Sequence, residues 1–159
     1  MEKLWKQSKE GVHTDWVIVT SDAKTITVHR IVMATSVNYF KTLYSNAKWI
    51  ENQMGMVLLP DISYDIMRSV VHFSYTGWLT DVTEDNFEDV LRAADRLDIP
   101  GILTIFREYI IKTLDITKCI GYYQMAIRYN LSETIEKIRE YILCHFVTVR
   151  MCLLTICSK

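Results

Sequence analysis

The stretch that decides the fold of this chain is Val28-His29-Arg30-Ile31-Val32-Met33-Ala34, where an extended pattern changes into a helical one. Before it, residues 25–28 alternate polar and apolar side chains with the period of two that is typical of a half-buried strand. After Arg30, apolar side chains recur at helical spacing, with a break near residues 36–38. The stretch therefore predicts a strand that leads directly into two short helices.

The neighbouring segments predict two further strands of the same small sheet. Residues 15–20 form a β-branched and aromatic run, and the polar residues 21–24 that follow predict a turn into the strand at 25–28. The short apolar run at 56–59 is closed by Pro60, as expected at the end of a third strand. We therefore expect a hairpin with a third strand that returns to it.

The rest of the chain is predicted to be helical. The first ten residues predict a short amphipathic helix that Gly11 ends. Apolar stripes with capping residues predict further helices, at 63–77 with Ser63 as cap, from Thr83 to the proline at 100, at 102–110, from Thr117 to 126 and from Ser132 to 142. Periodicity is lost in residues 147–159. The predicted class is α+β, mostly helical.

Composition points to a protein that binds other proteins. The chain has 159 residues, half of them hydrophobic, which is enough for one domain with a full core plus a small helical appendage. Lysine and arginine total 18 against 19 acidic residues, so the net charge of −1 offers no basic surface for nucleic acid or anionic lipid.

The N-terminus and the cysteines indicate a cytoplasmic protein. Charges stand among the first six residues where a secretory signal needs an apolar core, and the four cysteines all fall in the last third without regular spacing, which favours a reducing compartment. The apolar run at 141–157 contains His145 and Arg150 near its middle, so we expect no membrane span.

Motifs that carry chemistry are missing from the sequence. It has neither a glycine-rich phosphate loop nor a nucleophile elbow. Cys144 and His145 are adjacent, so their side chains diverge on a helix and cannot share a zinc ion unaided, and the cysteines are expected to be buried core residues. We therefore predict that the chain is not an enzyme and has no catalytic residues, cofactor or metal.

Five motifs occur in one order at domain-like spacing. They are Asp15-Trp16-Val17-Ile18-Val19, Val28-His29-Arg30-Ile31-Val32-Met33-Ala34, Ser36-Val37-Asn38-Tyr39-Phe40, Tyr75-Thr76-Gly77 and Ala93-Ala94-Asp95-Arg96-Leu97. This succession resembles the BTB (POZ) family from about residue 4 to residue 114, with Val28 in place of a small residue and Met33 in place of leucine. The resemblance implies a small sheet flanked by a helical cluster.

The segment that follows resembles the opening helix pair of a BACK domain, called the 3-box. The implied organisation is a BTB/POZ domain at 1–114, a partial BACK helix pair at 115–146 and an aperiodic tail at 147–159. The compact form and the Ile- and Tyr-rich composition look like poxvirus members of the BTB-Kelch group, which would place the chain in the host cytoplasm. The sequence contains no Kelch repeats.

The resemblance also implies a homodimer. Leu4 and Trp5 fall on the helix that packs across the two-fold axis in the family, and without a partner they would form an exposed apolar patch. Asp15 and Arg30 match the charged pair at the dimer groove, although an ordinary ion pair within one chain explains them equally well.

A second implied interface faces cullin-3. Trp49-Ile50-Glu51 matches the family's hydrophobic-x-Glu element, and Tyr39, Phe40 and the helix pair at 119–146 are expected to join it. A tryptophan beside a carboxylate suits an interface, because tryptophan is frequent at hot spots and a charge at the rim sets the register.

Several functions are compatible with this resemblance. The leading hypothesis is a dimeric adaptor that binds cullin-3 and links a substrate to an E3 ubiquitin ligase. Without a propeller, the chain would instead be a competitor that occupies cullin-3 or forms heterodimers with other BTB proteins, or an inactive remnant. The alternative is an oligomerisation module of the transcription-regulator type, which recruits corepressors without binding cullin.

Overall fold

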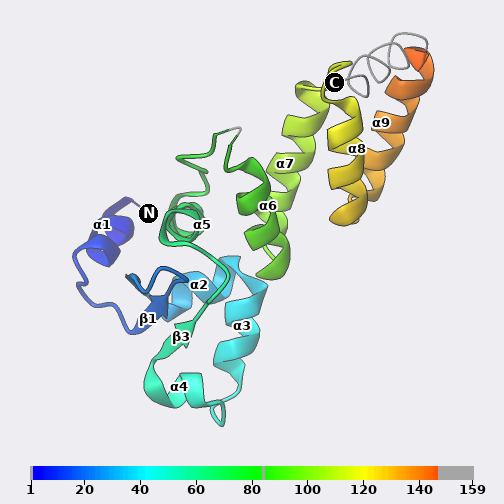
Figure 1. The fold of residues 1–159 in the computed structure, drawn as a ribbon. Helices are drawn as coiled ribbons and strands as arrows, with labels where there is room; N and C mark the ends of the chain where they lie inside the picture. Colours follow the sequence, from blue (N-terminus) through cyan, green and yellow to red (C-terminus); the bar gives the residue numbers. More distant parts are fainter. Residues whose placement is uncertain (1, 84, 147–159) are drawn as a thin grey trace. The chain divides into compact units, whose positions relative to one another are not determined.

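The computed structural model describes residues 2–83 and 85–146, and the predicted tail at 147–159 lies outside these residues. The packing divides the chain into two units, Met1–Leu103 and Thr104–Lys159. The first unit combines a small sheet with helices, and the second is helical in its described part (Figure 1). The predicted α+β class is confirmed.

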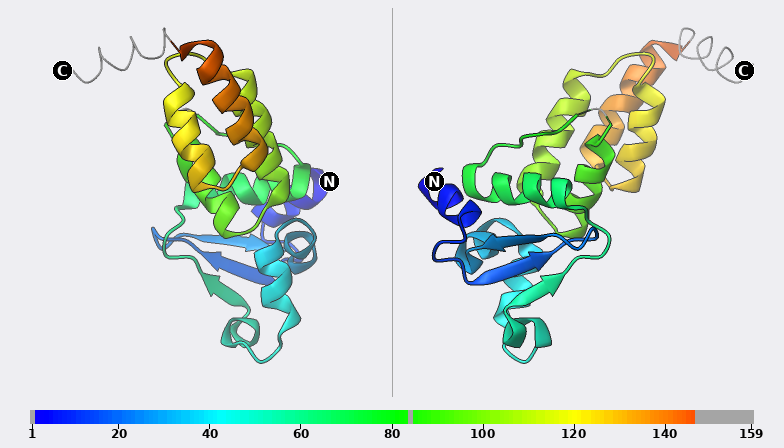
Figure 2. Two further views of the ribbon diagram at one scale, coloured as in Figure 1. Left: turned by 90° about the vertical axis from the view of Figure 1, so that its right-hand side faces the viewer. Right: turned by 60° about the vertical axis from the view of Figure 1, so that its left-hand side comes forward.

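The sheet of the first unit has three strands in the order β2-β1-β3. Strands β1 (Trp16–Val19) and β2 (Thr25–Val28) form the predicted antiparallel hairpin, and β3 (Met56–Leu58) lies parallel to β1 on its other side. The inner face is buried and consists of Trp16, Ile18, Ile26, Val28 and Val57. The opposite face is more open: among the described helices α1 reaches it at Thr27, whose hydroxyl donates to the Ser8 carbonyl at 2.9 Å (Figure 2).

The first unit contains six helices within its described residues, and α5 has the most partners among them. They are α1 (Glu2–Lys9), α2 (Arg30–Ser36), α3 (Asn38–Ser45), α4 (Ile50–Met54), α5 (Tyr64–Thr76) and α6 (Phe87–Arg96), and α7 (Pro100–Lys112) runs across the boundary between the units. Helix α5 contacts α1, α2, α6 and β2. Its Met67, Val70, Val71 and Tyr75 are fully buried, so α5 supplies much of the core.

The second unit contains the predicted helical hairpin. Helices α8 (Cys119–Arg128) and α9 (Ser132–Cys144) pack against each other along their length. Cys119, Ala126, Leu131 and Ile138 are buried and form the centre of the hairpin. Cys119 is therefore a core thiol as predicted, whereas Cys144 is exposed and the prediction was wrong there.

The predicted caps Ser63 and Thr83 make no capping bond among the residues that the structure describes, and one of the two helices begins later than predicted. Ser63 precedes α5 but makes no capping bond, and the Tyr64 N–H instead donates to the Asp22 carboxylate at 2.9 Å. Helix α6 begins at Phe87, four residues after Thr83, because the Asn86 side chain accepts from the Thr83 N–H and holds a turn there. The proline at 100 begins α7, a position where its missing N–H costs nothing.

Candidate protein-interaction surfaces

The short helix α4 and the residue that precedes it carry exposed apolar side chains. We call Trp49, Ile50 and Met54 the α4 surface; their side chains are 41%, 65% and 62% exposed. Ile50 and Met54 are four residues apart and so lie on the same side of the helix. Met54 was not predicted as a site residue, because no local sequence pattern indicates the short helix that places it on the same side as Ile50.

The side chain of Asn52 holds α4 in place. Its Nδ2 donates to the Leu43 carbonyl at 2.7 Å and to the Asn46 carbonyl at 2.6 Å, while its Oδ1 accepts from the Arg30 guanidinium at 2.8 Å. Gly55 ends the helix with a φ of 68°, a left-handed conformation that favours glycine. A five-residue helix is thus fixed to α2 and α3 by one amide.

The structure brings Tyr39 and Glu51 close together beside this surface. Tyr39 lies in the first turn of α3, where its N–H donates to the Leu97 carbonyl at 3.1 Å. Burial raises the pKa of Tyr39, Arg96 opposes the shift, and the carboxylate of Glu51 adds to it. Both side chains are half-buried, so they form a polar border to the α4 surface.

Phe40 does not belong to this surface. It is fully buried on the inner side of α3, with its ring 5.3 Å from that of Tyr39 and 5.7 Å from that of Tyr44. The prediction that Phe40 contacts a partner was therefore wrong, because a helix that presents Tyr39 outward turns the next residue inward. Phe40 instead supports Tyr39 from within the core.

Asp15 and Arg30 interact within the chain, but not through the ion pair of side chains that was the alternative to a role at the dimer groove. The Asp15 carboxylate accepts from the Arg30 backbone N–H at 2.7 Å, at the start of α2. The Arg30 guanidinium lies 4.8 Å from the ring of Trp16 and 4.7 Å from that of Tyr44, and donates to Asn52. Arg30 thus connects the sheet, α3 and α4 by cation–π contacts and a hydrogen bond.

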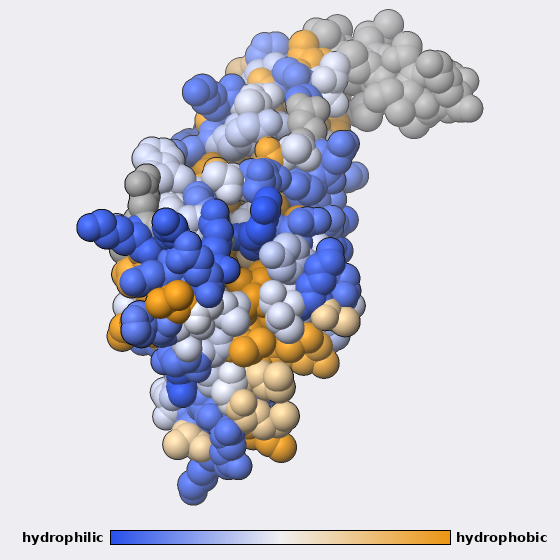
Figure 3. Space-filling model, turned by 90° about the vertical axis from the view of Figure 1, so that its left-hand side faces the viewer, coloured by the Kyte–Doolittle hydropathy of each residue, from blue (hydrophilic) through white to orange (hydrophobic). Residues whose placement is uncertain are grey.

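Leu4 and Trp5 have different roles on α1. The Trp5 ring packs on α5, 5.2 Å from the ring of His72 and 5.7 Å from that of Tyr75, so Trp5 is half-buried within one chain. Leu4 remains 37% exposed. Apolar side chains also gather on the lower half of the face shown in Figure 3.

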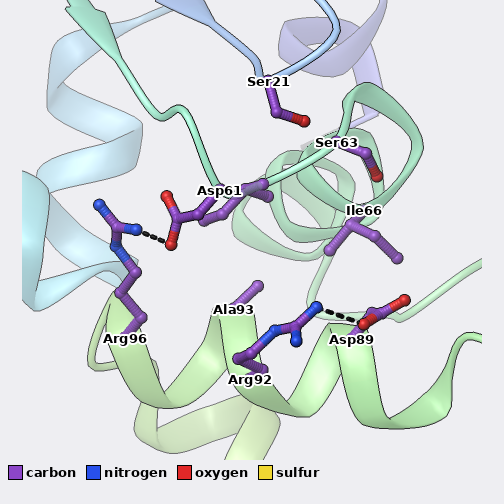
Figure 4. Close-up of a pocket in the computed structure, with 9 residues that line it drawn as sticks. Ser21, Asp61, Ser63, Ile66, Asp89, Arg92, Ala93 and Arg96 are labelled. Carbon is purple, nitrogen blue, oxygen red and sulfur yellow. Dashed lines mark hydrogen bonds and ion pairs between the residues drawn. The ribbon is translucent and has the colours of Figure 1, made fainter.

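A small hollow of about 150 Å³ lies between α5 and α6. Its two arginines both pair with carboxylates, Arg96 with Asp61 and Arg92 with Asp89 (Figure 4).

Within residues 2–83 and 85–146, no group of three His, Cys, Asp or Glu side chains could hold a metal ion. In the same residues, no helix has both the length and the apolar character needed to cross a membrane.

A comparison with protein families identifies most of the chain, from the start of the first unit into the beginning of the second. A family model described as the BTB/POZ domain matches residues 4–114. The chain belongs to the BTB/POZ family. The match accounts for the order of strand hairpin, paired helices and third strand, and BTB/POZ domains act as modules for protein interaction.

The relatives of this BTB/POZ chain include Kelch-like proteins. Kelch-like protein 41a of Danio rerio is 27% identical over 143 residues, 89% of this chain and 24% of that protein, and human Kelch-like protein 22 is 31% identical over 137 residues, 86% of this chain and 21% of that protein. The chain thus spans about a quarter of the length of these relatives. Both alignments are longer than 114 residues and so extend into the helical hairpin.

A solved structure shares the fold of the BTB/POZ unit. The BTB domain of zebrafish PATZ1 superposes with a TM-score of 0.60 at 22% identity, covering 70% of this chain and 87% of that domain. This likeness supports the predicted BTB/POZ fold.

Proposed function

We propose that this chain binds cullin-3 through the α4 surface, bordered by Tyr39 and Glu51, and acts in the E3 ubiquitin ligase pathway as a substrate adaptor or as a competitor of such adaptors. The observation that carries the proposal is an exposed tryptophan beside a half-buried carboxylate on a short helix held by Asn52. Both roles use the same surface.

The α4 surface has the properties of an interface hot spot. Hot spots are rich in tryptophan, and they gain from side chains whose conformation is fixed before binding, because less entropy is lost on association. Trp49 stands at the start of α4, and Asn52 fixes that helix from within. A partner that covers Trp49, Ile50 and Met54 removes their exposed apolar surface from water without having to fold the helix.

The Kelch-like relatives favour cullin binding over the corepressor alternative. Their similarity covers most of this chain, including part of the hairpin at 119–146, whereas the likeness to the PATZ1 domain concerns the fold. We therefore include the hairpin in the proposed cullin-binding region.

Isothermal titration with the cullin-3 N-terminal domain tests the proposal. Trp49→Ala and Glu51→Lys are each expected to weaken binding by more than about tenfold, or about 1.4 kcal/mol, with unchanged helix content. Trp78→Ala is the matched control, because Trp78 is 75% exposed but lies in the loop after α5. If the unaltered chain forms no complex, the cullin proposal fails and the corepressor alternative gains.

A further inference from the structure

A groove separate from the α4 surface runs along the free edge of β2. It has a volume of about 620 Å³, and we call it the β2 groove. The residues that matter for its chemistry are Trp5, Lys9, Thr25, Arg68 and His72. Its volume is within the range of about 300 to 1,000 Å³ that binding sites usually have.

The backbone of β2 points hydrogen-bonding groups toward this groove. In an antiparallel pair, alternate residues face the partner strand, and the bond from the Thr20 N–H to the Lys24 carbonyl fixes which ones do. The backbone N–H and C=O groups of Thr25 and Thr27 consequently face away from β1. The Thr27 carbonyl accepts from the Ser8 hydroxyl at 2.6 Å, but the outward groups of Thr25 have no bond to any described residue.

The groove also carries an excess of positive charge. The Lys9 ammonium lies 5.0 Å from the centre of the Trp5 ring and forms no ion pair with a carboxylate in the described part of the chain. Arg68 pairs with Asp81 at 2.7 Å, and both also line the groove. Lys9 and Arg68 thus supply two positive charges against the one carboxylate of Asp81, and a ligand with carboxylates would balance the charge of the groove.

We propose that the β2 groove binds an extended acidic peptide segment of a partner protein. The peptide adds to the sheet at the open edge of β2, with its backbone bonded to the outward N–H and C=O of Thr25. One of its carboxylates meets Lys9, and an apolar side chain packs over the contacting rings of Trp5 and His72, which both line the groove. This site does not depend on cullin binding.

Selection from a phage-displayed library of random peptides tests this proposal on the full chain. The enriched peptides are expected to be acidic and to shift the amide resonance of Thr25 in the nuclear magnetic resonance spectrum. Lys9→Glu should weaken these peptides by about tenfold or more, because it turns attraction into repulsion. Lys3→Glu, the same change on the same helix but not in the lining of the groove, should leave binding unchanged.

A second variant addresses the backbone contact. Thr25→Pro removes the outward N–H without removing a bond to β1, since proline is tolerated on edge strands, and it should abolish binding of the selected peptides. The proposal is overturned by a lack of enrichment over the Lys9→Glu protein, by enrichment of neutral or basic peptides, or by selected peptides that leave the Thr25 amide unshifted. It is also overturned if dilution alone shifts that amide, because a second copy of the chain would then fill the groove.

Discussion

At the level of single residues, Asp22 joins the turn between β1 and β2 to the start of α5. Its carboxylate accepts from the Thr20 hydroxyl at 2.7 Å and from the Tyr64 N–H at 2.9 Å, and it pairs with the Lys24 ammonium at 2.9 Å. The bonds to Thr20 and Lys24 contribute most to lowering the pKa of Asp22 to about 2. The charged form of Asp22 is therefore the one that the fold stabilises.

The lowered pKa predicts how stability changes in acid. The unfolded chain binds a proton at Asp22 near pH 3.8 and the folded chain only near pH 2, so this contribution is complete above about pH 4 and is lost as the pH falls to about 2. Urea unfolding of the wild type and of Asp22→Asn should show a difference in unfolding free energy that shrinks across this range. Asp95→Asn, at an exposed aspartate, serves as the control. A difference that does not change with pH would refute the assignment.

At the level of elements, α4 depends on a contact that no local pattern contains. Asn52 is the link, because it bonds two carbonyl groups and the Arg30 guanidinium at once. Asn52→Ala is expected to lower the unfolding free energy by about 1 to 3 kcal/mol, since it leaves half-buried polar groups without partners. Gln53→Ala, at the exposed neighbouring amide, should change it by less than about 0.5 kcal/mol. Denaturant unfolding measures both, and equal effects would show that Asn52 does not hold α4.

An element could be predicted from the sequence where neighbours in the chain stabilise it, and could not where residues from other elements do. The hairpin and the paired helices follow from residues 15–44, because their apolar periods are set by neighbours in the chain. Helix α4 has five residues and could not be predicted, because its stability comes from Asn52 and Arg30 rather than from a stripe of its own. The start of α5 was assigned to the wrong cap because Asp22 lies 42 residues away in the sequence.

The residues of the candidate site also divide into those that a local sequence pattern reveals and those whose position depends on tertiary packing. Trp49, Ile50 and Glu51 could be chosen from the sequence because their order matched a family element, and the structure places the first two at the surface. Phe40 could not be assigned correctly, and the packing of Trp5 within the chain could not be predicted, because the direction of an aromatic side chain depends on tertiary packing. Trp5 finds His72 and Tyr75 on α5, contacts that no pattern around residue 5 reveals.

At the level of the whole molecule, we propose that the chain forms a homodimer through α1. With Trp5 engaged by its own α5, Leu4 is the residue of the predicted dimer pair whose apolar side chain remains for a second copy. A two-fold axis makes the interface self-complementary, so one substitution alters both halves of it. The dimer should therefore be more sensitive to a change at Leu4 than the fold is.

Light scattering at micromolar concentration tests this prediction. The unaltered chain should have the mass of a dimer, and Leu4→Glu should raise the dissociation constant by more than about tenfold, because two carboxylates replace two apolar contacts across the axis. Leu143→Glu makes the same change at an exposed leucine of the second unit and should leave the dimer intact. Trp5→Ala is unsuitable, since it removes a contact that holds α1 to α5 within one chain. A monomeric wild type would contradict the dimer, and a dimer that tolerates Leu4→Glu would show that another surface forms it.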